Sequence, residues 1–180
     1  MRSVHKYVGL LFAVVLGLFG VVGTAGATDA AGAEKVRGVG ATAYGWLVNN
    51  HSNMCLAVPG GSKVEGTGLI QWGCGTWDDH YWGFEPWTIG GAQYYRVINL
   101  NSQQCLAVPG GSTVEGTQVI QWGCGTWDDH FWRLEPTGSG TTRIVNYRSG
   151  QCLAIPGAST AQGERVIQWG CGTWPDHYWR

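Results

Sequence analysis

The sequence predicts an all-β fold built from three similar units, and three observations lead to this prediction. Glycine accounts for 30 of the 180 residues. The apolar runs are short and bounded by turn residues, which is typical of short strands joined by tight turns and not of helices. A segment of the chain also occurs three times, and such self-similarity marks folds whose units cannot bury their apolar faces alone.

The repeated segment begins at a cysteine and ends at a tryptophan. Residues 55–82 and 105–132 are identical at 24 of 28 positions, and residues 105–132 and 152–179 at 20 of 28. The spacings between the segments are 50 and 47 residues. We therefore expect one domain over residues 44–180, with repeats at about 44–90, 91–138 and 139–180.

Each unit contains four candidate strands. In the first unit they are residues 44–49, 54–58, 69–73 and 80–85, with turn-rich segments between them. Four strands in three units give about twelve, and a closed or nearly closed barrel would hold them with few unprotected edges. The least repeated segments, residues 86–95 and 136–143, are predicted to be simple connectors.

The first 27 residues have the pattern of a secretory signal peptide. Arg2 and Lys6 precede an uncharged apolar run over residues 8–23, and small residues at 25–27 predict cleavage after Ala27. A membrane anchor is the alternative, but the run is shorter than the ~20 apolar residues of a spanning helix. We expect a secreted, extracellular protein with no membrane association after cleavage, and a flexible lead over residues 28–43.

The charge balance argues against nucleic acid as a partner. Residues 28–180 contain nine Lys and Arg against twelve Asp and Glu, and the basic residues form no cluster. Binding to nucleic acid needs a basic patch that neutralises phosphates. The expected partner is therefore not a nucleic acid.

All six cysteines follow the predicted signal peptide, and an exported chain is expected to pair them. Six cysteines allow fifteen pairings, but here they fall into three pairs nineteen positions apart. We predict the disulfides Cys55–Cys74, Cys105–Cys124 and Cys152–Cys171, each worth about 3 kcal/mol through loop closure. No C-x2-C spacing suggests a zinc site, and no metal or other cofactor is expected.

These features together resemble the ricin B-chain type lectins and the family 13 carbohydrate-binding modules. The resemblance rests on the paired cysteines, on "CLAVPGG" at the first of them, on an aromatic residue two before the second and on a tryptophan eight after it. It covers residues 44–180. It implies a β-trefoil with pseudo-threefold symmetry and up to three shallow sugar pockets, one in each unit, usually without catalysis.

The chain departs from the galactose pocket that this resemblance implies. The family has an aspartate two residues after the first cysteine, where this chain has Ala57, Ala107 and Ala154. The glutamine of the family's Q-x-W motif is a histidine in each unit, and the usual asparagine before it is an aspartate. A sugar hydroxyl left without a partner costs about 1–3 kcal/mol. We therefore expect a ligand other than simple galactose.

Four side chains in each unit are candidate ligand contacts. Two tryptophans can stack on the apolar face of a sugar, and an aspartate and a histidine can bond its hydroxyl groups. The candidates are Trp72, Trp77, Asp79 and His80 in the first unit, Trp122, Trp127, Asp129 and His130 in the second, and Trp169, Trp174, Asp176 and His177 in the third. Alternatively, the histidines bond backbone groups and the loop tryptophans cover the core of their own unit.

Two further expectations concern these residues. Pro175 occupies the position of Asp78 and Asp128, so a pocket that has lost function is expected to be the third. Asp79 and His80 are adjacent on a predicted strand, and their side chains should therefore point to opposite faces and not chelate one metal ion.

The sequence therefore predicts a non-catalytic carbohydrate-binding protein. A polysaccharide or cell-surface glycan suits it, because several weak pockets on one rigid body gain by avidity on a repetitive ligand. An enzyme is disfavoured, since the candidate acids and histidines are triplicated and would be spread around a threefold axis. The alternative is a protein-binding trefoil, such as an inhibitor or assembly factor, with vestigial sugar pockets.

Overall fold

The computed structural model describes residues 34–35 and 43–180, which belong to one compact unit, Ala31–Arg180. The predicted signal peptide and most of the predicted lead lie outside the described residues. The described part consists of strands and short 3-10 helices, and it contains no helix long and apolar enough to cross a membrane. The all-β prediction is confirmed.

The strands follow the three sequence repeats. Repeat 1 contains β2 (Tyr44–Trp46), β3 (Cys55–Ala57), β4 (Ile70–Trp72) and β5 (Tyr81–Ile89); repeat 2 contains β6 (Ala92–Asn99), β7 (Cys105–Ala107), β8 (Ile120–Trp122) and β9 (Trp132–Pro136); repeat 3 contains β10 (Thr142–Asn146), β11 (Cys152–Ala154) and β12 (Ile167–Trp169). The fourth strand of repeat 3 is reduced to bridges of Trp179 with Asn49 and Thr142. An additional strand, β1 (Glu34–Lys35), pairs with β5.

Two short 3-10 helices occur in each repeat. One follows the first cysteine strand, at η1 (Pro59–Gly61), η3 (Pro109–Gly111) and η5 (Pro156–Ala158). The other precedes the final tryptophan, at η2 (Asp78–His80), η4 (Asp128–His130) and η6 (Pro175–His177). Proline fixes the first residue of η1, η3 and η5, and the second residue is a glycine with positive φ in each.

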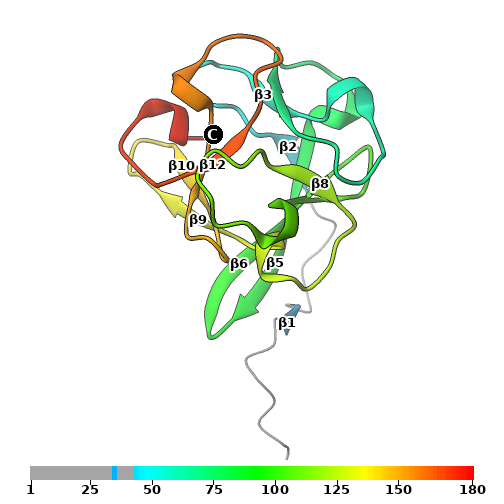
Figure 1. Cartoon of the computed structure of the whole chain (residues 1–180), viewed down its shortest axis with the longest axis vertical. Helices are drawn as coiled ribbons and strands as arrows, with labels where there is room; N and C mark the ends of the chain where they lie inside the picture. Colours follow the sequence, from blue (N-terminus) through cyan, green and yellow to red (C-terminus); the bar gives the residue numbers. More distant parts are fainter. Residues whose placement is uncertain (1–33, 36–42) are drawn as a thin grey trace, which may run out of the picture. The chain divides into compact units, whose positions relative to one another are not determined.

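The prediction of a simple connector over residues 86–95 is wrong. Strands β5 and β6 pair along their whole length, from Trp82 opposite Asn99 to Ile89 opposite Ala92. Figure 1 shows this hairpin extending beyond the shorter strands. Its apolar side chains are buried in a second cluster, which consists of Trp87, Ile89, Tyr94 and Phe131. The aromatic and β-branched residues of this segment therefore form a packed face and not a loop. Residues 136–143 likewise contain the paired ends of β9 and β10 around a short turn.

The three repeats meet at a ring of three backbone hydrogen bonds. The Leu69 amide donates to the Val119 carbonyl at 2.9 Å, the Val119 amide to the Val166 carbonyl at 3.0 Å, and the Val166 amide to the Leu69 carbonyl at 2.9 Å. All three residues are fully buried. Each repeat thus satisfies the backbone of another, and the ring closes only with three repeats. Together with the repeat structure, this confirms the predicted threefold β-trefoil (Figure 1).

The final tryptophan of each repeat fills the core. Trp82, Trp132 and Trp179 are at most 1% exposed. Each indole N–H donates to a backbone carbonyl of its own repeat at 2.9 Å; the acceptors are Leu56, Leu106 and Leu153. A buried indole needs such a partner, so the position favours tryptophan over other apolar residues.

A buried glutamine links each repeat to another. The Gln121 amide group donates to the carbonyls of Ser62 at 2.8 Å and Val64 at 3.1 Å. Gln71 and Gln168 make the equivalent bonds to repeats 3 and 2. This explains the glutamine of the repeated "IQWG" segment, to which the sequence analysis assigned no role.

The three predicted disulfides are present, with Cα–Cα distances of 5.0 Å in each. In each repeat one cysteine begins β3, β7 or β11. The other lies two residues after the end of β4, β8 or β12. The described part of the chain has no free cysteine.

The burial of the core tryptophans predicts a large difference between two substitutions in repeat 2. Trp132→Ala should lower the free energy of unfolding by about 3–5 kcal/mol, because it removes a fully buried ring and leaves a cavity. The control Trp127→Ala removes a ring that is 59% exposed and should cost less than about 1 kcal/mol. Urea unfolding followed by circular dichroism measures both, and similar losses in the two variants would contradict the assignment.

Candidate functional site

Cavities lie at equivalent places in repeats 2 and 3. The cavity in repeat 2 has a volume of about 650 Å³ and lies between η3, β8 and η4. The cavity in repeat 3 has a volume of about 510 Å³ and lies between η5, β12 and η6. Eight of the predicted site residues line them: Trp122, Trp127, Asp129 and His130 in repeat 2, and Trp169, Trp174, Asp176 and His177 in repeat 3.

Repeat 1 has the same local arrangement of candidate residues. Trp72 and Trp77 are 38% and 59% exposed, close to the values of their equivalents in the other repeats. Asp79 and His80 lie in η2 as Asp129 and His130 lie in η4. The structure thus brings the four candidate residues of every repeat into the same arrangement.

The tryptophan that ends β4, β8 or β12 lies against a glycine turn of another repeat. A Cβ atom at Gly66, in repeat 1, would stand 3.5 Å from the ring of Trp122. Trp72 and Trp169 have the same relation to Gly163 and Gly116. The glycine turn supports one side of the ring, while the exposed part of the ring faces the cavity.

The loop tryptophan lies over a glycine. A Cβ atom at Gly125 would stand 2.1 Å from the ring of Trp127, so a side chain at this position would displace the ring. The same ring lies 5.2 Å from the ring of His130 at an angle of 55°. The equivalent contacts occur in repeats 1 and 3. This explains why the loop reads C-G-T-W in each repeat.

The aspartate and the histidine of η4 point toward one another. The Nε2 atom of His130 lies 3.7 Å from Oδ2 of Asp129. The expectation that adjacent residues here point to opposite faces is wrong, because they lie in a 3-10 helix and not in a strand. The described residues nevertheless contain no group of three side chains that could hold a metal ion.

The other nitrogen of His130 accepts a hydrogen bond from the backbone. The Gly125 amide donates to Nδ1 at 3.4 Å, and His177 accepts in the same way from Gly172. Since Nδ1 accepts, the neutral ring carries its proton on Nε2 and directs it toward the aspartate. The histidine side chain is only 3% exposed. This geometry fits the structural alternative, in which the histidine holds the loop and orients the carboxylate.

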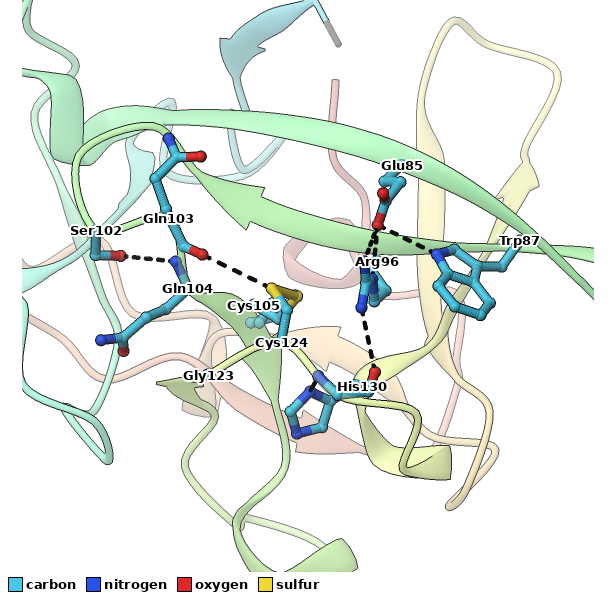
Figure 2. The surroundings of a disulfide bond; sticks show 12 residues. Glu85, Trp87, Arg96, Ser102, Gln103, Gln104, Cys105, Gly123, Cys124 and His130 are labelled. Atoms are coloured by element: carbon cyan, nitrogen blue, oxygen red, sulfur yellow. Dashed lines mark hydrogen bonds and ion pairs between the residues drawn. A yellow bond between two sulfur atoms is a disulfide. The ribbon is translucent and has the colours of Figure 1, made fainter. Parts of the chain in front are cut away.

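Burial lowers the pKa of His130 in the folded protein; the Asp129 carboxylate opposes this effect and the Arg96 guanidinium adds to it. Arg96 lies in β6, pairs with Glu85 and lies 4.7 Å above the ring of Trp87 (Figure 2). It also donates to the Gly125 carbonyl at 3.4 Å. The pKa of His177 is lowered in the same way, with Asp176 and Arg143 in the corresponding roles. The pKa of His80 is lowered by burial against the effect of Asp79.

Two features of the repeat 2 cavity were missed by the sequence analysis. One is the segment Pro109–Gly111, which is part of the lining of the cavity. The other is Arg148, which reaches the cavity from the loop after β10 in repeat 3. Only the fold reveals this contribution, because Arg148 lies outside the repeated segment. One sequence signal pointed to this residue: His51, Asn101 and Arg148 occupy equivalent positions in the three repeats but are three different residue types.

A family model described as a ricin-type beta-trefoil lectin domain-like family matches residues 84–169. The designed 3-fold symmetric protein ThreeFoil has a TM-score of 0.72 and 32% sequence identity, and the match covers 76% of this chain and 96% of that chain. No curated protein sequence matches the chain significantly.

Two longer proteins of known structure share the fold. The exo-beta-1,3-galactanase 1,3Gal43A from Clostridium thermocellum has a TM-score of 0.71 and 25% identity, covering 77% of this chain and 29% of that chain. The hemolytic lectin CEL-III has a TM-score of 0.62 and 26% identity, covering 81% of this chain and 31% of that chain. The chain therefore spans less than a third of each of these proteins.

The lowered histidine pKa values predict a loss of stability in acid. Below about pH 6.5 the unfolded histidines bind protons that the folded ones resist, so the free energy of unfolding falls as the pH is lowered through this range. The triple variant His80→Gln, His130→Gln, His177→Gln should show a smaller fall between about pH 7 and about pH 5. The exposed His51→Gln serves as the control. Urea unfolding at both pH values tests this, and equal falls in the two variants would contradict it.

The contact of Trp127 with Gly125 predicts the effect of a single methyl group. Gly125→Ala should displace the Trp127 ring, because the added carbon would overlap it. NMR should show changed chemical shifts of the His130 ring protons, because the Trp127 indole lies against this ring in the wild type. Gly45→Ala is the matched control, since a Cβ atom there meets nothing within 4 Å. Unchanged His130 shifts in Gly125→Ala would show that the loop geometry is wrong.

Proposed function

Because the chain belongs to the ricin-type β-trefoil lectin-like family, we propose that it is a secreted, non-catalytic carbohydrate-binding protein with up to three sugar pockets. Family membership supports carbohydrate binding in general, and the pockets suggest where it occurs. The three disulfides fit an oxidising, extracellular environment, as does the predicted signal peptide over residues 1–27.

One observation carries this proposal: an exposed tryptophan and an oriented carboxylate line the same cavity. In repeat 2 these are Trp122 and Asp129, and in repeat 3 Trp169 and Asp176. An indole ring stacks on the apolar face of a pyranose, and a carboxylate accepts hydrogen bonds from hydroxyl groups. The cavity is thus suited to a sugar that contacts both residues.

The carboxylate comes from a different place than in the family's galactose pocket. Ala107, at the family's aspartate position, is 1% exposed and lines the cavity without a polar group. Asp129 supplies the acceptor from η4 instead, and Nε2 of His130 lies 3.7 Å from its carboxylate. A sugar must therefore present its hydroxyl groups toward η4, which supports a ligand other than simple galactose.

The carboxylates of these cavities favour binding over catalysis, because a pair of them is not common to both cavities. A glycosidase needs two carboxyl groups on either side of the scissile bond. The two carboxylates of the repeat 2 cavity, Asp128 and Asp129, are neighbours in η4. Among the described residues, the repeat 3 cavity is lined by the single carboxylate Asp176, since Pro175 replaces the second aspartate. Equivalent pockets on one rigid body instead favour binding to a repetitive glycan, such as a polysaccharide or a cell-surface glycan.

The test is a binding screen of residues 28–180 on a glycan array and on insoluble polysaccharides. The variant Trp72→Ala, Trp122→Ala, Trp169→Ala should bind at least about tenfold more weakly, because each pocket loses its stacking surface. Its unfolding midpoint should stay close to that of the wild type, since these rings are 38–40% exposed.

The matched control is the double variant Val64→Ala, Val114→Ala. It removes exposed apolar side chains that line neither cavity, and repeat 3 has Ala161 at the same position. The control should bind like the wild type. A folded wild-type chain that binds no glycan would overturn the proposal and favour the alternative of a protein-binding trefoil with vestigial pockets.

A further inference from the structure

We propose that the pocket of repeat 2 recognises a sugar with an anionic substituent, a carboxylate or a sulfate, through the guanidinium group of Arg148. This inference rests on the proposed function and names the ligand chemistry of one pocket. Arg148 belongs to repeat 3, yet it lines the cavity of repeat 2 together with Trp122 and Asp129.

Hydrogen bonds hold the loop of Arg148 at this cavity. The Asn146 amide group donates to the Asp129 carbonyl at 2.8 Å, which fastens the end of β10 to η4. The Arg148 backbone amide donates to Oδ1 of Asn146 at 3.0 Å. The position of Arg148 is therefore set by the same helix that carries Asp129.

The guanidinium group of Arg148 is free to bind a ligand. Its side chain is exposed and makes no hydrogen bond or ion pair with any residue in 34–35 or 43–180. The other arginines within these ranges each have a polar partner for the side chain; they are Arg96, Arg133, Arg143, Arg165 and Arg180. A guanidinium group binds a carboxylate or sulfate oxygen pair through two parallel N–H groups.

Arg148 and Asp129 both lie close to Gly111 in the lining of the cavity. A Cβ atom at Gly111 would stand 3.9 Å from Oδ1 of Asp129 and 4.0 Å from Nε of Arg148, in van der Waals contact with both side chains. The carboxylate and the guanidinium group thus lie near one another at the cavity without forming an ion pair. A sugar residue bound in the cavity can meet an acceptor for a hydroxyl group in Asp129 and a cation for an anionic group in Arg148.

The negative charges in the pocket limit what it can bind. Asp128 and Asp129 both line the cavity. They repel a densely charged polyanion, so the pocket favours a sugar with one anionic group that faces Arg148 and hydroxyl groups that face η4.

The other two repeats lack this arrangement. In repeat 1 the equivalent of Arg148 is Asn101, whose neutral side chain already donates to the Gly61 carbonyl at 2.8 Å. In repeat 3 the equivalents are His51 and, in place of Gly111, Ala158. The preference for an anionic sugar therefore belongs to repeat 2.

The experiment compares two series of three probes, and within each series the probes differ only at C6 of the sugar. Methyl glucoside, its C6 carboxylate and its 6-sulfate, and the same galactose series, are titrated into residues 28–180. Binding in repeat 2 is followed by the NMR signals of the Trp122 and Trp127 indole N–H groups. We expect at least one anionic probe to bind about tenfold more tightly than its neutral counterpart. The carboxylate and sulfate arms show which anion the pocket takes.

Arg148→Asn, which introduces the residue of repeat 1, should remove this preference, and Arg148→Glu should reverse it. Arg165→Asn is the control, because it removes the same charge from an exposed arginine that lines neither cavity. A preference that survives in Arg148→Asn, or equal binding of neutral and anionic probes by the wild type, overturns the inference but leaves the proposed function intact. If no probe shifts the indole signals and the glycan screen is also negative, both fail.

Discussion

The rest of the structure depends on the ring of backbone hydrogen bonds that joins Leu69, Val119 and Val166. Each of these bonds crosses from one repeat to another, so every repeat depends on the others to satisfy these buried backbone groups. The buried glutamines extend the same constraint, because the amide of Gln121 satisfies carbonyl groups that belong to repeat 1. The three units therefore have to fold together, and this shared geometry favours similar core residues in all three.

Much of the fold could be predicted because the segment from the first cysteine to the final tryptophan occurs three times in the sequence. The cysteine spacing identified the disulfides, and the final tryptophans identified the core. The hairpin of β5 and β6 was missed, since its sequence is among the least repeated in the chain. The contacts of Trp87 with Phe131 and of Tyr94 with Tyr147 join residues that are far apart in the sequence, and no local pattern reveals them.

The candidate site could be predicted only in part, for a similar reason. The four residues of each repeat are close in sequence, so their grouping was expected, and the structure places them together. The direction of the side chains was not predictable, because the sequence of a three-residue 3-10 helix does not distinguish it from the first residues of the following strand. In that helix the Nδ1 atom of His130 accepts a backbone hydrogen bond, and its Nε2 atom faces the carboxylate of Asp129. Arg148 differs from its equivalents His51 and Asn101, but only the fold shows that it lines the cavity of another repeat.

The loop that carries Arg148 has a consequence for how such a chain can be divided or rearranged. The repeat 2 cavity takes its floor from one unit and part of its rim from the next, and Asn49 of repeat 1 binds the Asp176 carbonyl of repeat 3 in the corresponding place. A single excised unit would therefore contain most of the cavity lining but lack the residues that another unit contributes to its edge. A circular permutant opened between two units would retain every floor and rim, and the residues of the rim can diversify during evolution without disturbing the core that all three units share.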